Sequence, residues 1–269
     1  MAKIKANPFL SAPKLNQELK KGLDIHVSNQ TIRNIIRSSG IYSRSSRKKP
    51  FLSKLHKAKR FRWAKNHQNW TVNDWKKVIW SDETKINLFG SDGVHRVWRK
   101  NKQALNHKNI RPTVKHGGGH RMVWACMSWY GLGTYEIIHG KLTGSGYKEI
   151  LERNLFVSKR KMGLGRSFVF QQDGDPKHTC KLMKDWFAKH RVKVMDWPPQ
   201  SPDLNVIEHL WSQLKPKVSE SRSSNFKELE EAIKNAWENV DHSYIKKLVE
   251  GMPKRVQAVI KARGGYIKY

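Results

Sequence analysis

The sequence predicts an α/β protein, a mixed sheet with helices on its faces, preceded by a small all-α module. From residue 75 onward, neighbouring strand-like segments come first, and strands then alternate with amphipathic helices, which is typical of such a sheet. Before that point, residues 1–73 carry 17 Lys and Arg against only Glu18 and Asp24. An apolar content of 38%, with 11 Trp and 9 Phe, supplies enough material for a packed core and excludes a disordered basic chain.

The charge balance of the chain indicates a polyanionic partner. Lys and Arg number 53 against 22 Asp and Glu, a formal net charge of +31, which favours binding to nucleic acid. No apolar run approaches the roughly 18 to 20 residues of a membrane-spanning helix, so no membrane partner is expected. Cys126 and Cys180 lie too far apart in sequence for a Cys-x-x-Cys half-site, and we expect two buried thiols.

Residues 1–46 are predicted to form a helix-turn-helix module. One helix is expected over 13–23, and Ser28 can cap a second helix over 29–39. The apolar stripe of the second helix consists of Ile32, Ile35 and Ile36. Its outer face carries side chains of the kinds that reach base edges and phosphates: Gln30, Arg33, Asn34 and Arg37. A lone helix with this face would more often be merely solvated, but the segment that follows favours DNA binding.

Residues 47–74 are predicted to be a basic linker. Ten Lys and Arg lie between Arg44 and Lys65 without one carboxylate, interrupted by Phe51, Phe61 and Trp63. An extended segment of this composition suits contact with DNA phosphates, nuclear import or both. Its first candidate DNA contacts are Arg47, Lys48 and Lys49.

Residues 75–220 are predicted to contain the mixed sheet, and 221–269 to form C-terminal helices packed on it. Strands are expected over 77–81, 85–89, 94–99, 121–128, 167–172 and 192–197. Helices are expected over 147–159, 178–190 and 205–214, with two amphipathic helices between 225 and 261.

Three carboxylates stand where a catalytic site is expected. Asp82 and Asp173 each follow an apolar strand, and ligands of open α/β sheets bind beyond strand ends. Glu208 flanks the buried stripe of the 205–214 helix, so its carboxylate can face the sheet. Carboxylates that converge repel one another unless cations neutralise them, and hard oxygen ligands select Mg²⁺ or Mn²⁺. In so basic a protein, such a site indicates phosphodiester chemistry with two metal ions.

The blocks around these carboxylates resemble the mariner-like superfamily of DDE transposases, in the Sleeping Beauty branch. The blocks are WSDETK at 80–85, QDGDPKHT at 172–179 and the proline-rich segment 197–211, with further similarity at 94–100, 113–119 and 249–255. Between Asp173 and Glu208 lie 34 residues, as in that branch. Relatives carry two helix-turn-helix units, and the resemblance implies that this sequence begins at the second and lacks the first.

The resemblance implies a ribonuclease H-like catalytic fold in which Asp82, Asp173 and Glu208 hold two Mg²⁺ or Mn²⁺ ions. Lys177 and His178 are expected to touch DNA phosphate. Three further acids of the same blocks are expected to be turn or supporting groups: Glu83, Asp175 and Asp203. The glycine run at 117–119 lacks a following Lys-Ser/Thr, so no nucleotide cofactor is expected; relatives use this region as an arm that clasps a partner subunit.

Departures from the family pattern lie beside the catalytic positions. Val206 replaces the usual Pro, Gly174 replaces Asn, and Pro216 is expected to kink or end the helix that carries Glu208. None of these changes removes a carboxylate.

The function that the resemblance implies is cut-and-paste DNA transposition in the nucleus. It comprises binding to transposon inverted repeats in double-stranded DNA, metal-dependent hydrolysis and strand transfer into TA target DNA, with a homodimer in the DNA complex. The alternative is a catalytically silent, truncated or domesticated DNA-binding protein. A basic structural protein would explain the charge but not three ordered acidic blocks, and a retroviral-type integrase would need a zinc module.

Overall fold

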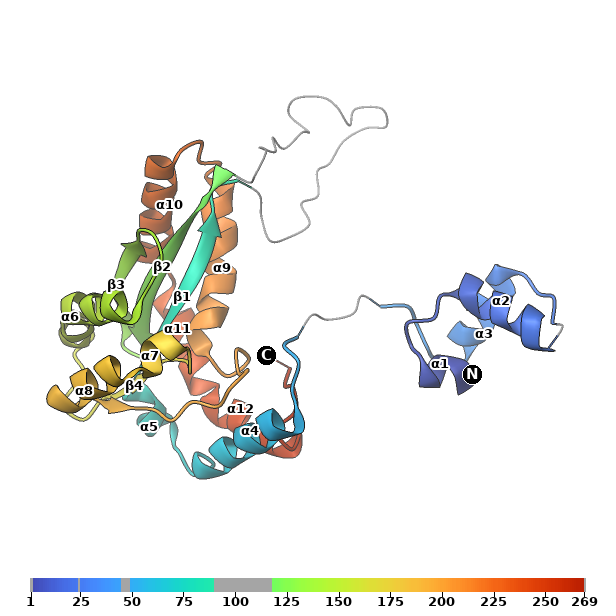
Figure 1. The fold of residues 1–269 in the computed structure, drawn as a ribbon, viewed down its shortest axis with the longest axis horizontal. Coiled ribbons are helices and arrows are strands. Elements are labelled where there is room, and N and C mark those ends of the chain that lie inside the picture. The colour runs from blue at the N-terminus through green and yellow to red at the C-terminus, as the bar shows by residue number, and fades with distance from the viewer. Residues whose placement is uncertain (1, 24, 45–48, 90–117, 269) are drawn as a thin grey trace. The chain divides into compact units, whose positions relative to one another are not determined.

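The computed structural model describes residues 2–23, 25–44, 49–89 and 118–268. The chain divides into two compact units, 1–49 and 50–269 (Figure 1). The boundary therefore falls some 25 residues before the expected one near residue 75. The expected strand at 94–99 and the first residue of the glycine run at 117–119 lie outside the described residues.

The first unit contains α1 (Ala2–Ala6), α2 (Ala12–Leu23) and α3 (Asn29–Ser38). The Ser28 side chain accepts a hydrogen bond from the Thr31 amide at 3.0 Å, so the expected N-cap begins α3. Ile4, Leu15 and Ile32 form its small core. Ile35 is 53% exposed, so only Ile32 and Ile36 of the three expected isoleucines pack against the core.

Helices replace the extended linker expected over 47–74. These are α4 (Lys54–Asn66), capped by Ser53, and α5 (Val72–Lys76), which begins with a capping box between Thr71 and Asp74. Trp63 and Ala64 of α4 and Trp75 of α5 are buried in the core of the second unit. The linker prediction was wrong because Trp63, which lies among the basic residues, is a core residue, whereas Phe51 is 82% exposed.

The sheet in the described part of the chain has the strand order β3-β2-β1-β4-β5. Its strands are β1 (Val78–Asn87), β2 (His120–Ser128), β3 (Gly131–Ile138), β4 (Val169–Gln171) and β5 (Lys193–Val194). The pairs β1–β2 and β2–β3 are antiparallel, whereas β1–β4 and β4–β5 are parallel. The sheet is therefore mixed, as expected.

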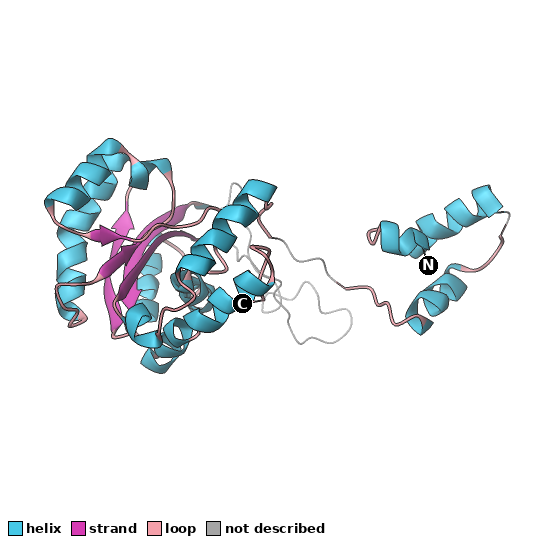
Figure 2. Ribbon diagram, turned by 90° about the horizontal axis from the view of Figure 1, so that it is seen from below, coloured by secondary structure: helices cyan, strands magenta, loops and turns pink. Residues whose placement is uncertain are grey.

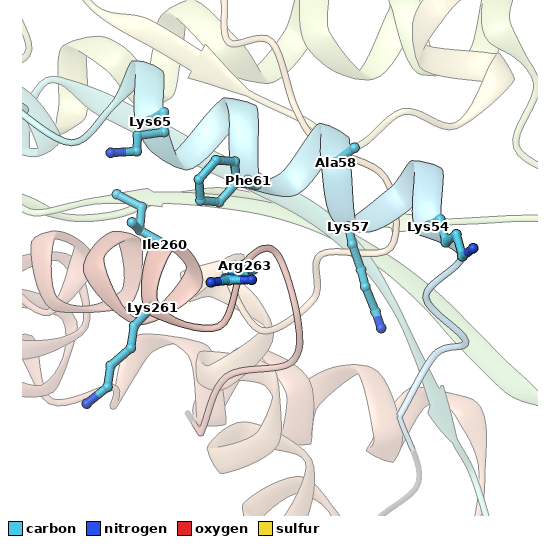
Figure 3. Close-up of a pocket in the computed structure, with 8 residues that line it drawn as sticks. All are labelled: Lys54, Lys57, Ala58, Phe61, Lys65, Ile260, Lys261 and Arg263. Carbon is cyan, nitrogen blue, oxygen red and sulfur yellow. The ribbon is translucent and has the colours of Figure 1, made fainter.

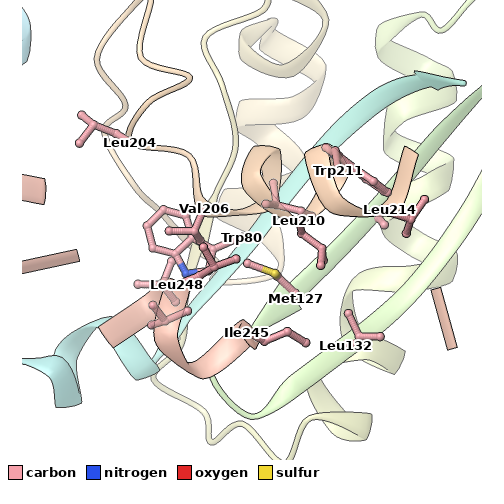
Figure 4. Close-up of a cluster of buried hydrophobic side chains, with 14 of the residues drawn as sticks. Trp80, Met127, Leu132, Leu204, Val206, Leu210, Trp211, Leu214, Ile245 and Leu248 are labelled. Carbon is pink, nitrogen blue, oxygen red and sulfur yellow. The ribbon is translucent and has the colours of Figure 1, made fainter. Parts of the chain in front are cut away.

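Helices cover both faces of this sheet (Figure 2). On one face, Val78 and Trp80 pack with α9 (Val206–Glu220), α10 (Phe226–Glu238), α11 (His242–Glu250) and α12 (Met252–Lys261). Figure 4 shows part of this core, where Trp80 and Met127 meet Leu210 and Ile245. On the other face, Ile79 packs with α6 (Gly144–Lys161) and α8 (Lys181–Lys189). Alternate residues of β1 thus serve opposite cores.

Several expected elements have different bounds. The segments 77–81 and 85–89 form one strand, β1, because its pairing with β2 continues from Trp80 to Asn87. β3 was not predicted. The expected helix at 178–190 is divided into α7 (Pro176–Thr179) and α8, and the tail from 221 holds three helices rather than two.

Pro216 does not end α9, which continues to Glu220. Leu214 and Val218, on either side of the proline, are both buried in the same core, and this packing carries the helix past it. No helix in the described segments is long and apolar enough to cross a membrane.

Candidate active site

The parallel pair β1–β4 brings Asp82 and Asp173 together. Trp80 and Gln171 are partners in this pair, and each aspartate lies two residues beyond its partner position. β4 ends at Gln171, but β1 continues to Asn87, so Asp82 lies within a strand and opposite Ala125 of β2. The expectation that Asp82 follows a strand is corrected. β4, not β1, ends at this point, so Asp82 lies on a part of β1 that no longer pairs with β4.

Glu208 lies in the first turn of α9, which packs on β1 through Ile207 and Leu210. Leu204 and Asn205 before the helix are buried, so the helix start is fixed against the sheet. Glu208 itself keeps access to solvent, although neighbouring atoms crowd its carboxyl.

The Asp82 and Glu208 carboxyls both have raised pKa values. Burial and then the charges of Glu208, Glu83 and Asp173 raise the pKa of the Asp82 carboxyl well above its usual value. Burial also raises the pKa of Glu208; Lys215 opposes this rise, whereas Asp173 and Asp203 add to it. Asp82 therefore lies in a field of negative charge, and Lys215 offsets the rise at Glu208 only in part, so a bound cation would relieve both carboxylates.

Asp173 differs from the other two carboxylates because it has cationic partners. Burial acts to raise its pKa, but hydrogen bonds from His178 and from the Asp175 amide, together with Lys177, bring the pKa below its usual value. His178 Nδ1 lies 2.7 Å from Asp173 Oδ1, and His178 Nε2 lies 3.1 Å from Glu83 Oε1. The imidazole thus bridges Asp173 to β1.

His178 is 3% exposed, with both ring nitrogens bonded to carboxylates. Burial acts to lower its pKa, but the hydrogen bonds to Asp173 and Glu83 outweigh it and raise the pKa to about 9, so the ring is a cation at neutral pH. The expectation that His178 touches DNA phosphate is corrected: its side chain is enclosed and holds Asp173. Lys177 is partly buried and lies 2.7 Å from Asp175 and 3.5 Å from Glu83.

Two further residues hold this arrangement and were not expected from the sequence. The Tyr147 ring lies on the His178 ring with centroids 4.0 Å apart, and its hydroxyl donates to Gln172 Oε1 at 2.9 Å. Gln172 Nε2 donates to the His178 carbonyl at 3.1 Å. The only sequence signal was that Gln172 belongs to the block QDGDPKHT; Tyr147 of α6 carried none.

The loop that precedes α9 is held by a buried ion pair. The Arg60 guanidinium of α4 binds both oxygens of Asp203, at 2.7 and 2.8 Å, and also donates to the Gly264 and Gly265 carbonyls. Asp203 Oδ2 also accepts from the Ile267 amide at 3.2 Å. Arg60, which the sequence placed in a phosphate-binding linker, is instead fully buried, and Asp203 is a supporting group as expected.

The donor set at this edge of the sheet fits a hard divalent cation. Asp82, Asp173 and Glu208 offer only carboxylate oxygens, and the pKa values of Asp82 and Glu208 are raised by burial and by neighbouring carboxylates, which a bound cation would relieve. Among the described residues, no three His, Cys, Asp or Glu side chains are already arranged around one point as a ligand set. Convergence of the three carboxylates to ligand distance stays a prediction.

The residues expected to contact bases lie on one exposed face of α3. Gln30, Arg33, Asn34 and Arg37 are all exposed. Gln30 donates to Asn34 Oδ1 at 2.9 Å, which orders part of this face. Lys49 is also exposed, whereas Arg47 and Lys48 lie outside the described residues.

The chain is similar to known transposases along most of its length. Residues 1–69 match a helix-turn-helix family described as Transposase, and residues 77–230 match the family described as DDE superfamily endonuclease. The Tc1 transposase of Caenorhabditis elegans is 43% identical over 242 residues, which cover 90% of this chain and 88% of that protein.

Solved structures share the fold. A Mos1 transposase paired-end complex with the left transposon end has a TM-score of 0.83 at 16% identity, and covers 99% of this chain and 78% of its own. A Mos1 mariner paired end complex with Mg has a TM-score of 0.82 at 17% identity, with the same coverage. This likeness extends to the sheet that carries Asp82 and Asp173.

Proposed function

Because this chain belongs to the Tc1/mariner family of DDE transposases, we propose that it cuts DNA at transposon ends and joins them to target DNA. The reaction is phosphodiester hydrolysis followed by strand transfer, with Asp82, Asp173 and Glu208 as the catalytic carboxylates. The observation that carries the proposal is the placement of Asp82 and Asp173 at matching positions beyond the paired part of β1 and β4, with Glu208 in the first turn of α9, which packs on β1.

The three carboxylates would hold divalent cations, two Mg²⁺ or Mn²⁺. When bound, such ions polarise the phosphate and stabilise the attacking and leaving oxygens of an in-line displacement. The rest of the chain positions these carboxylates. His178 and Glu83 hold Asp173 in place, and the Arg60–Asp203 pair holds the loop before Glu208.

The DNA partner is bound by the exposed face of α3 and by basic residues of both units. We propose transposon inverted repeats in double-stranded DNA as the ends that are cut, and TA dinucleotides as the target. We propose a homodimer in the DNA complex, because two transposon ends must be held at once. The 34 residues between Asp173 and Glu208 favour the Sleeping Beauty branch.

We also propose that the protein works in the nucleus, where its DNA substrate is. The basic composition of residues 44–65 supports nuclear import. A fluorescent fusion of the full chain in animal cells is expected to concentrate in the nucleus, and uniform fluorescence would contradict this.

The test is an end-cleavage assay with the full chain and a duplex that carries the inverted repeat. We expect strand breaks at the repeat terminus with Mg²⁺ or Mn²⁺, none with EDTA, and joining of the freed 3′ end to a TA-containing plasmid. Binding of the same duplex without cleavage under every metal condition would instead identify a catalytically silent DNA-binding protein.

A further inference from the structure

A strongly basic groove lies between α4 and the end of α12, within the second unit (Figure 3). Its volume is about 560 Å³. Five cationic side chains line it, and no carboxylate does: Lys54, Lys57, Lys65, Lys261 and Arg263. All five are exposed, whereas the groove floor between them includes the partly buried Phe61 and Ile260.

The cations of α4 form a row along the groove. Lys57, Phe61 and Lys65 follow one another at intervals of four residues and therefore share a helix face. From Lys54 to Lys65 the helix rises about 16 Å, at 1.5 Å per residue. A strand of duplex DNA advances about 3.4 Å along the axis per phosphate, so this row spans several successive phosphates.

The opposite wall is held rigidly against α4. The Arg60 side chain donates to the Gly264 and Gly265 carbonyls, which directly follow Arg263. Gly264 has φ +80°, and a Cβ there would overlap the Lys57 carbonyl oxygen. The backbones of the two walls are thus in contact, and Lys261 and Arg263 are held beside the lysine row.

We propose that this groove binds the sugar-phosphate backbone of duplex DNA, as a contact separate from α3. Five cations without a carboxylate fit a polyanion, and the apolar floor fits the deoxyribose rings between phosphates. The sequence drew attention to the α4 lysines but not to Lys261 and Arg263, which only the fold brings beside them.

This inference rests on the proposed function, since it takes DNA as the partner, but its test measures binding alone. If the chain binds DNA but does not cleave it, the result of this binding test is the same. The groove variant is the full chain with Lys57→Gln, Lys261→Gln and Arg263→Gln. The matched control removes three exposed cations from α8, on the opposite face of the sheet: Lys181→Gln, Lys184→Gln and Lys189→Gln.

The measurement is the affinity for a duplex of scrambled sequence between about 50 and 200 mM salt. Each lost phosphate contact removes about 0.9 from the slope of log K against log salt, so the groove variant should lose about 2 to 3 units of slope. Its affinity loss across this range should then be about 40-fold smaller than that of the unsubstituted chain. The α8 control should keep the original slope.

Charge-conserving substitutions provide the rescue. The full chain with Lys57→Arg, Lys261→Arg and Arg263→Lys should bind with the original slope. Because all three side chains are exposed, the variants should melt at the temperature of the unsubstituted chain. Equal slopes for the groove variant and the unsubstituted chain would overturn the proposal, and so would an equal loss in the α8 control, which would indicate a general effect of net charge.

Discussion

Asp203 and Arg60 form a forked, fully buried ion pair that joins α4 to the loop before the helix of Glu208. Both carboxylate oxygens accept from the guanidinium, at 2.7 and 2.8 Å. The pair links segments 143 residues apart in sequence. The basic helix α4, which follows the first unit in the sequence, is thereby attached to the loop that positions Glu208.

This pair predicts a large stability effect from one exchange on α4. Arg60→Met leaves the Asp203 carboxylate buried without its partner, which should cost about 3 to 5 kcal/mol of unfolding free energy. Arg62→Met on the exposed side of the same helix should change it by less than about 0.5 kcal/mol. Urea unfolding of both variants checks this, and similar values for the two would contradict the ion-pair account.

The His178 bridge predicts a pH dependence of stability in the metal-free protein. Its pKa is about 9 when folded against 6.5 for an unperturbed histidine, so the contribution of the charged ring is fully present below about pH 6.5. It is lost as pH rises through about 9, and should amount to something on the order of 3 kcal/mol.

His178→Gln should remove this part of the pH dependence, whereas His190→Gln, on the exposed end of α8, should retain it. The measurement is the urea midpoint in EDTA between about pH 6 and pH 10. If the His178→Gln protein loses stability over this range as steeply as the unsubstituted chain, the bridge does not carry the charge assigned to it.

Asp82 predicts a trade between stability and metal binding. Its pKa is raised in the folded protein, so the ionised carboxylate destabilises the metal-free fold at neutral pH. Asp82→Asn should therefore raise the melting temperature in EDTA. Mg²⁺ at 100 times its dissociation constant should stabilise the unsubstituted chain by about 2.7 kcal/mol, and this gain should vanish in the variant.

Asp185→Asn, an exposed position on α8, is the matched control for that experiment and should keep the full metal-induced gain. Calorimetry with and without Mg²⁺ gives both quantities for each protein. A metal-induced gain that survives in Asp82→Asn would show that the ion binds elsewhere.

The exposed face of α3 predicts a separation of specific from general DNA contacts. Arg33→Ala should weaken binding to the inverted repeat by about 1 to 3 kcal/mol and leave a scrambled duplex little affected. Lys49→Gln should weaken both alike. The described helices of the first unit supply a single helix-turn-helix, so the ratio of the two affinities for the unsubstituted chain should stay below about 10³. A larger ratio would show that α3 suffices for specific recognition.

Local patterns in the sequence predicted the parts that depend on near neighbours. The Ser28 cap and the spacing of Ile32 and Ile36 indicated α3, and apolar runs ending near Asp82 and Asp173 indicated two central strands. The face of α9 followed from its buried stripe of Ile207 and Leu210.

Long-range contacts account for what the sequence did not predict. In the sequence, Arg60 is one basic residue among several on α4 and cannot be told from its exposed neighbours. Its burial depends on contacts with Asp203 and Gly264, far along the chain. His178 lies next to Lys177 in a polar block, and its enclosure depends on Glu83 and Tyr147 from other elements. The sequence predicted two strands in place of β1 because the polar residues in its middle resemble a turn. Only the continuous pairing with β2 identifies a single strand.

The most direct test of the central claim compares DNA cleavage with DNA binding in three isosteric variants, Asp82→Asn, Asp173→Asn and Glu208→Gln. The amides keep the shape of the carboxylates but lose the charge that holds the metal ions. Each variant should lose end cleavage while its affinity for the inverted-repeat duplex stays close to that of the unsubstituted chain, because binding depends on basic residues outside the triad. Cleavage that survives in any one of the three, or affinity that falls together with cleavage, would contradict the assignment of this site.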